Sequence, residues 1–157
     1  MVSSSMSALF SAASFPFFSI YGASKFAVEA LTDGLRYEVS QLGIDVTLVQ
    51  PSAYLTPMYA KVQQPDDGDR ASAYGAVGEI PAAMFKHFTT IFQSADAPNP
   101  HDVAEAIATL VALPKGSRPV RTVVGATFGS DTVNAQTALT QARVVDALGL
   151  GHLAKIA

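Results

Sequence analysis

A long helical pattern that passes directly into a strand determines much of what this chain can fold into. Between residues 19 and 42, apolar side chains recur at steps of three and four, which is the repeat of an α-helix. The recurring residues are Tyr21, Phe26, Ala27, Ala30, Leu31, Leu35 and Val39. Ser19 is the expected N-cap, and Gly43 stands where a left-handed residue commonly ends a helix.

The segment "IDVTLVQ" at 44–50 follows this helix and predicts a strand that ends at Pro51. It is mostly apolar on both faces, as is typical of a strand inside a parallel sheet. The other predicted elements are a strand end at 1–5, a long loop at 52–80, helices at 80–93 and 101–114, a strand at 118–125 and a weakly helical tail at 130–157. Strands that alternate with helices in this way indicate an α/β fold with a parallel sheet.

The composition excludes several classes of function. Of the 157 residues, 49% are hydrophobic and only 15% are charged, which favours extensive burial within one domain or between subunits. The net charge is −3 and Lys and Arg form no cluster, so nucleic acid is not expected as a partner. The chain has no cysteine, which excludes disulfides and thiolate metal sites and fits a reducing cytoplasm. His87 and His101 stand alone, so no metal site is predicted.

The first 24 residues carry no charge, but they do not read as a targeting or membrane segment. A secretory signal has basic residues before its apolar stretch, whereas the first basic residue here is Lys25. Pro16 and several serines interrupt the apolar character that a spanning helix needs. We therefore expect a cytoplasmic protein without a membrane partner.

Tyr21 and Lys25 are one helical turn apart in the stretch "YGASK", with only small residues between them. A nearby ammonium favours the phenolate form and lowers the pKa of a tyrosine from about 10. Such a phenol could exchange a proton with an alcohol or carbonyl oxygen near neutral pH. The spacing alone is common, and the ordinary alternatives are a packed tyrosine and a surface lysine.

The surroundings of this pair resemble the short-chain dehydrogenase/reductase family. The resemblance rests on a serine-rich strand end, the Y-x-x-x-K motif with the "FAVEAL" helix, the "LRYE" turn, the "GIDVTLV" strand, and a proline and a threonine after it, within residues 3–61. "DVAEAIATLV" and "RPVRTVVG" look like the later helix and last strand of the family. The resemblance implies a Rossmann-like, doubly wound parallel sheet. The chain is expected to be the C-terminal portion of that domain, because the glycine-rich loop and the first strands of the family are not in this sequence.

By this resemblance, Tyr21 is the general acid/base, and Lys25 assists it and binds the nicotinamide ribose. The family's catalytic serine lies at the end of the preceding strand. Ser5 is expected in this role, with Ser4 and Ser7 as alternatives.

The resemblance also implies NAD or NADP as the cofactor, since side chains cannot carry a hydride. Pro51, Ser52 and Thr56 are expected at the cofactor together with Tyr21 and Lys25. Ser52 departs from the family, which has a glycine after this proline. Thr56 matches the threonine that contacts the carboxamide or phosphates of the cofactor.

Three parts are expected within the domain: a catalytic segment at 1–53, a substrate lid at 54–99, and the last helix, last strand and tail at 100–157. The lid is rich in large apolar residues, which favours a hydrophobic alcohol or carbonyl compound as the substrate. These residues are Met58, Tyr59, Tyr74, Met84, Phe85, Phe88 and Phe92.

Two functions follow from these observations. The first is an NAD(P)-dependent oxidoreductase that interconverts an alcohol and a ketone or aldehyde, with little or no activity in this chain alone. The second is a non-enzymatic pseudo-dehydrogenase that acts as a dimerisation or scaffold module. In both cases the helix at 19–42 is the expected interface of a homo-oligomer.

Overall fold

The computed structural model describes residues 2–4, 13, 15–57, 61, 63, 66–92 and 97–157, with only the backbone of 2–4 and 91–92. It divides into two compact units, which are treated separately below. Unit 1 consists of Met1–Ala53 and His101–Ala157, and unit 2 of Tyr54–Pro100.

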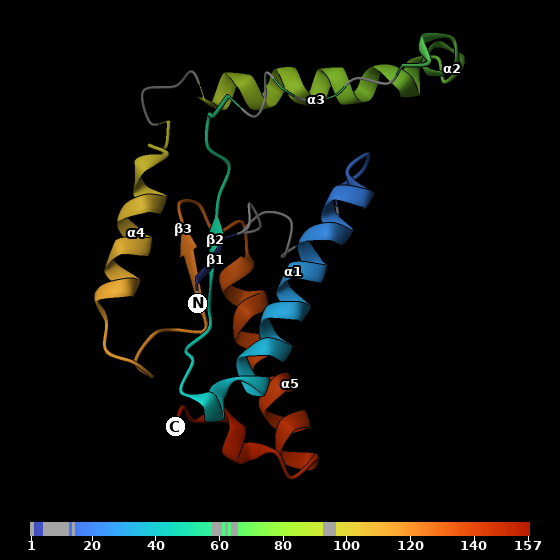
Figure 1. The fold of residues 1–157 in the computed structure, drawn as a ribbon. Helices are drawn as coiled ribbons and strands as arrows, with labels where there is room; N and C mark the ends of the chain where they lie inside the picture. The colour runs from blue at the N-terminus through green and yellow to red at the C-terminus, as the bar shows by residue number, and fades with distance from the viewer. Residues whose placement is uncertain are drawn as a thin grey trace. The chain divides into compact units, whose positions relative to one another are not determined.

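Unit 1 is built on a three-stranded parallel sheet in the order β1-β2-β3 (Figure 1). The strands are β1 Val2–Ser4, β2 Thr47–Pro51 and β3 Arg121–Val124. In the register, Val2 lies opposite Thr47, and Leu48 lies opposite Arg121. Every residue of the central strand β2 is buried, as its apolar sequence predicts. The predicted parallel sheet is therefore confirmed, although the strands are shorter than the predicted ranges.

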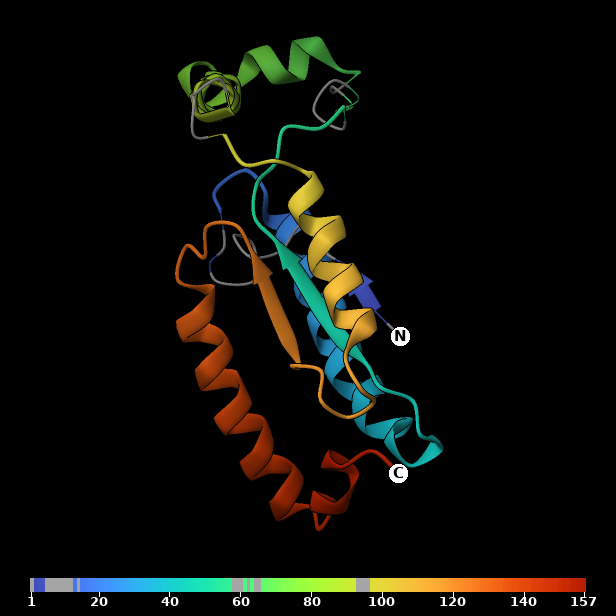
Figure 2. The same ribbon diagram turned by 90° about the vertical axis from the view of Figure 1, so that its left-hand side faces the viewer.

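Helices cover both faces of this sheet. The elements of unit 1 are α1 Ser19–Glu38, η1 Ser40–Leu42, α4 His101–Ala112, α5 Ser130–Ala147 and η3 Gly151–Ala154. Figure 1 and Figure 2 show α1 and α5 on one face of the sheet and α4 on the other. This three-layer arrangement confirms the predicted doubly wound α/β fold. The 130–157 tail, predicted as weakly helical, contains a helix of 18 residues.

The ends of α1 differ in part from the prediction. The expected N-cap, Ser19, is already helical, and the cap position is Phe18, without a side-chain cap. The reason is an earlier turn of the chain, in which Phe17 adopts a φ of 67°. At the other end, the chain tightens into η1, and Gly43 closes it with a φ of 70°. The predicted left-handed glycine is therefore confirmed, one short 3₁₀ turn after the α-helix.

The side of α1 that is buried is not the apolar side. Its buried residues are Gly22, Glu29 and Thr32. Phe26 and Leu31, which belong to the apolar repeat, are 43% and 72% exposed. The helical period was read correctly, but the sheet offers polar partners to α1, so the polar stripe of the helix faces inward.

The described part of unit 2 includes the helices α2 Gly68–Ala73 and α3 Ala76–Phe92. The prediction of a loop over 52–80 is wrong for this part. Asp67 caps α2, because its carboxylate accepts a hydrogen bond from the Arg70 amide at 2.8 Å. α3 begins at Ala76, earlier than the predicted start at residue 80, so Pro81 lies inside the helix, where its missing N–H removes one hydrogen bond of the helix.

Candidate functional site

Tyr21 and Lys25 occupy the first two turns of α1. The Lys25 Nζ atom lies 5.0 Å from the centroid of the Tyr21 ring, and both side chains are half-buried. This is the geometry of a cation–π contact. The predicted shared face is confirmed, and the pair brings an ammonium donor beside a phenol. The small residues between Tyr21 and Lys25 leave room for this contact. One of them, Ser24, donates its hydroxyl to the Tyr21 carbonyl at 2.6 Å.

The carboxyl end of β2 lies at the edge of the sheet from which α1 also begins. Parallel strands place all their carboxyl ends at one edge, where α/β folds bind ligands. Pro51 is the last residue of β2, and the Ser52 amide continues the ladder with a 2.8 Å bond to the Val124 carbonyl. Ser52 is buried and its φ is not positive, so the path of the backbone does not require the family's glycine here.

The structure does not test the positions of the other predicted site residues. Ser4 is the last residue of β1, and only its backbone is described. Ser5 and Ser7 lie outside the described residues, so the position of the catalytic serine stays a prediction. Thr56 is half-buried and belongs to unit 2, and its cofactor contact also stays a prediction.

The predicted lid residues lie in unit 2. Tyr74 and Phe85 are 63% and 41% exposed, and Met84 and Phe88 are half-buried. Met58 and Tyr59 are outside the described residues, as is the side chain of Phe92. Within unit 2, α3 therefore presents apolar side chains without burying them, and their contact with a substrate stays a prediction.

A polar network on the α1 side of the sheet was not predicted from the sequence. Arg121 on β3 donates from Nε to Glu29 Oε2 at 2.9 Å and from Nη2 to Asp33 Oδ2 at 2.5 Å. Gln50 on β2 donates from Nε2 to Glu29 Oε1 at 2.7 Å. Asn134 on α5 donates to Gln50 Oε1 at 2.7 Å. The network thus joins two helices and two strands.

The charged groups of this network are largely buried, and one guanidinium serves two carboxylates. The side chain of Arg121 is 9% exposed, and those of Glu29 and Asp33 are 11% and 16% exposed. Burial alone would lower the pKa of Arg121, but the hydrogen bonds and charges of Glu29 and Asp33 raise it above its ordinary value. The available signal in the sequence was a glutamine and an arginine within strands that are otherwise mostly apolar.

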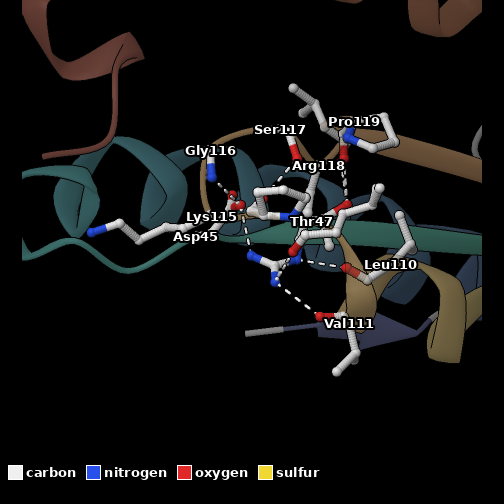
Figure 3. A network of polar contacts seen from close by, with 12 residues as sticks. Asp45, Thr47, Leu110, Val111, Lys115, Gly116, Ser117, Arg118 and Pro119 are labelled. Carbon is white, nitrogen blue, oxygen red and sulfur yellow. Dashed lines mark hydrogen bonds and ion pairs between the residues drawn. The ribbon is translucent and has the colours of Figure 1, made fainter.

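A second polar network lies at the amino end of β2 (Figure 3). Arg118 pairs with Asp45, with Nη1 3.0 Å from Oδ2. The same guanidinium donates to the carbonyls of Leu110 at 2.7 Å, Val111 at 3.2 Å and Leu113 at 2.7 Å, and so caps the carboxyl end of α4. By the topology of the sheet this network is at the edge opposite to Ser52.

Neither a metal centre nor a membrane span is found in the parts of the chain that the structure describes. There, no group of three or more His, Asp or Glu side chains could hold a metal ion. Likewise, no helix in the described ranges is both long and apolar enough to cross a bilayer.

Comparison with known proteins supports the resemblance seen in the sequence. Residues 3–67 match the family model described as short chain dehydrogenase. This segment contains Tyr21, Lys25, Pro51, Ser52 and Thr56. No curated protein matches the chain.

Among solved structures, the chain is similar to a short-chain dehydrogenase from Streptomyces avermitilis, with a TM-score of 0.51 and 23% identity. The match covers 96% of this chain and 50% of that one. This chain therefore spans about half the length of that dehydrogenase and shares its fold over that half.

Proposed function

We propose that this chain carries the catalytic segment of an NAD(P)-dependent oxidoreductase that interconverts an alcohol and a ketone or aldehyde. The observation that supports the proposal best is the contact between Tyr21 and Lys25, inside a segment that matches short-chain dehydrogenases. The general part of this proposal is oxidoreductase activity, and the specific part is the class of substrate. The apolar residues of unit 2 favour a hydrophobic small molecule as the substrate, and the absence of cysteine favours a cytoplasmic location.

The residues present fit the nicotinamide riboside half of such a cofactor. Lys25 offers three N–H donors, which suit the ribose hydroxyls, and it is partly exposed beside Tyr21. Pro51 and Ser52 end a strand at the edge where α/β folds bind nucleotides. When bound, the nicotinamide would supply or accept the hydride.

The roles of the side chains follow from their chemistry. The phenol of Tyr21 gives its proton to the carbonyl oxygen when a ketone is reduced and takes it back when an alcohol is oxidised. The ammonium of Lys25 stabilises the phenolate that remains. A serine hydroxyl, Ser5 with Ser4 and Ser7 as alternatives, would hold the substrate oxygen beside the phenol.

The test is a Tyr21→Phe substitution with a matched control on the same helix. We expect kcat for reduction of hydrophobic ketones by NADH or NADPH to fall about 10²–10⁴-fold, the usual contribution of a general acid. Tyr37→Phe is the control, because Tyr37 also lies on α1 under a cation, with Arg36 Cζ 5.5 Å from its ring. The assay uses the complete natural polypeptide that contains this segment. Near-wild-type kcat in Tyr21→Phe would refute the proposed role.

A second candidate function is a dimerisation or scaffold module. The specific observation is the outer face of α1, where Ile20 is 88% exposed and Leu31 is 72% exposed, with exposed alanines between them. We propose a second copy of the chain as the partner, because a stripe of small and large apolar residues can pack against its own two-fold copy. If the complete polypeptide shows no oxidoreductase activity, this second function gains support.

A further inference from the structure

The apolar side chains of α1 are buried only in part; Val28 and Leu35, for example, are half-buried. No large apolar side chain of α1 is buried in the described structure. Gly22 has no side chain, and the Thr32 hydroxyl donates to the Val28 carbonyl of its own helix at 2.7 Å. Glu29 and Asp33 make side-chain hydrogen bonds from α1 to the strands.

Four residues make this connection, and we call them the α1 clamp: Glu29, Asp33, Gln50 and Arg121. Both carboxylate oxygens of Glu29 are bound, one by Gln50 and the other by Arg121. Arg121 bonds the two carboxylates, which are one turn apart on the helix. This geometry fixes the rotation of α1 about its axis as well as its position along the sheet, because each bond is directional.

The carboxyl end of α1 is tethered by contacts that do not involve the clamp. Beyond the carboxyl end of α1, the Ala157 amide donates to the Ser40 carbonyl at 3.1 Å, and Gln41 Nε2 donates to the Lys155 carbonyl at 3.0 Å. The other end of α1 carries Tyr21 and Lys25. The clamp lies between these two ends of the helix.

The distance from the clamp to the pair makes small tilts important. Tyr21 is eight residues before Glu29, which is about 12 Å along the axis at about 1.5 Å per residue. A tilt of about 5° about the clamp would move Tyr21 by about 1 Å, and a misplacement of that size can cost about 10²-fold in rate.

We propose that Arg121 is a positioning residue, which sets the orientation of α1 through Glu29 and Asp33 and thereby holds Tyr21 and Lys25 in place. The inference rests on the proposed function of that pair. Arg121 acts on the pair through the helix and not by direct contact. The competing explanation is that Arg121 stabilises unit 1 as a whole and has no particular effect on the start of α1.

Arg118 provides a matched control for this distinction. It is also an arginine in a partly buried ion pair of unit 1, and it bonds an aspartate and a helix end at the other edge of the sheet. Arg118→Met and Arg121→Met both remove a guanidinium and leave carboxylates behind. Only Arg121→Met removes the clamp.

The experiment is hydrogen–deuterium exchange of the backbone amides of 19–28, measured on this 157-residue chain at urea concentrations that give the two variants equal free energies of unfolding. We expect these amides to exchange at least about tenfold faster in Arg121→Met than in Arg118→Met, because local opening has its own free energy. Arg121→Lys should recover part of the difference. Equal exchange of 19–28 in the two methionine variants would overturn the proposal. If Arg121→Met does not fold, Glu29→Gln against Asp45→Asn provides the same comparison.

A second measurement separates this inference from the proposed function. In the complete polypeptide, Arg121→Met should lower kcat at least about tenfold, because the reacting groups are displaced. KM should stay within about twofold of the wild-type value, because the residues that bind the substrate are not changed. If Tyr21→Phe shows that the pair is not catalytic, the exchange result still decides whether Arg121 positions α1. If the pair is catalytic and kcat of Arg121→Met equals that of Arg118→Met, the positioning role is refuted.

Discussion

The cap that Arg118 forms on α4 allows a quantitative prediction of stability. Replacing Arg118 with methionine keeps most of the aliphatic stem but removes the guanidinium. The substitution breaks the 3.0 Å ion pair with Asp45 and three hydrogen bonds to carbonyls at the end of α4. Asp45 remains, with a side chain only 8% exposed, and still accepts a hydrogen bond from the Gly116 amide at 3.0 Å.

The expected loss in the free energy of unfolding is about 3 kcal/mol. Breaking a buried ion pair by removing one partner costs about 3–5 kcal/mol, because the other charge is left without compensation. The lower end applies here, since Arg118 is 19% exposed and the Gly116 amide still compensates Asp45 in part. A cation at the carboxyl end of a helix contributes up to about 2 kcal/mol in partly buried positions. This contribution is already included in the loss given above and is not added to it.

Urea unfolding measured by circular dichroism is the assay. With a slope of about 1.5 kcal/mol/M, the midpoint should fall by about 2 M at an unchanged slope. Arg118→Lys should lose less, because it keeps the charge but not the planar fork that reaches several acceptors at once. Adding Asp45→Asn to Arg118→Met should restore part of the loss, since the uncompensated charge is removed. A wild-type midpoint in Arg118→Met, or strictly additive losses in the double variant, would refute the reasoning.

The remaining predictions concern a glycine and an exposed leucine. Gly43→Ala should lower the free energy of unfolding by about 1–2 kcal/mol, because the residue has a φ of +70° and an added Cβ would stand 3.1 Å from Lys115 Nζ. Gly43→Asn should lose less in the same urea titration, and equal losses would contradict the left-handed explanation. Leu31→Arg should convert the proposed dimer to a monomer by light scattering without changing the midpoint, since Leu31 is 72% exposed. A wild-type protein that is already monomeric, or a variant that stays dimeric, would contradict the proposed interface.

Local patterns in the sequence were sufficient for much of unit 1. The β-branched run before Pro51 predicted the buried strand β2, and the apolar period after Pro100 predicted α4. Gly43 was recognised because few other residues accept its backbone conformation. Tyr21 and Lys25 were placed together correctly because a helix brings residues four apart into contact whatever the rest of the chain does.

The parts that could not be predicted depend on partners far away in the sequence. Nothing near Glu29 indicates that it will bond Arg121, which is 92 residues further along. For the same reason, the apolar repeat of α1 was no guide to which side of the helix faces the sheet. Helix α2, which was predicted as part of a loop, has only six residues and lies in a polar segment. Its local signal in the sequence was Asp67, the N-cap residue. The catalytic serine stays a prediction, because Ser5 and Ser7 are outside the described residues.

The division of unit 1 into two stretches of chain also governs the order in which it can form during synthesis. Residues 1–53 leave the ribosome first, followed by all of unit 2 and only then by α4 and β3. Asp33 must wait for Arg121, 88 residues later, which takes about 4–18 s at the usual rate of about 5–20 residues per second. Until then α1 carries two carboxylates without their cation, and β2 lacks β3, one of its two neighbouring strands. A nascent chain arrested before residue 121 should therefore expose this edge of β2 to chaperones, whereas one arrested after release of the whole of unit 1 should not.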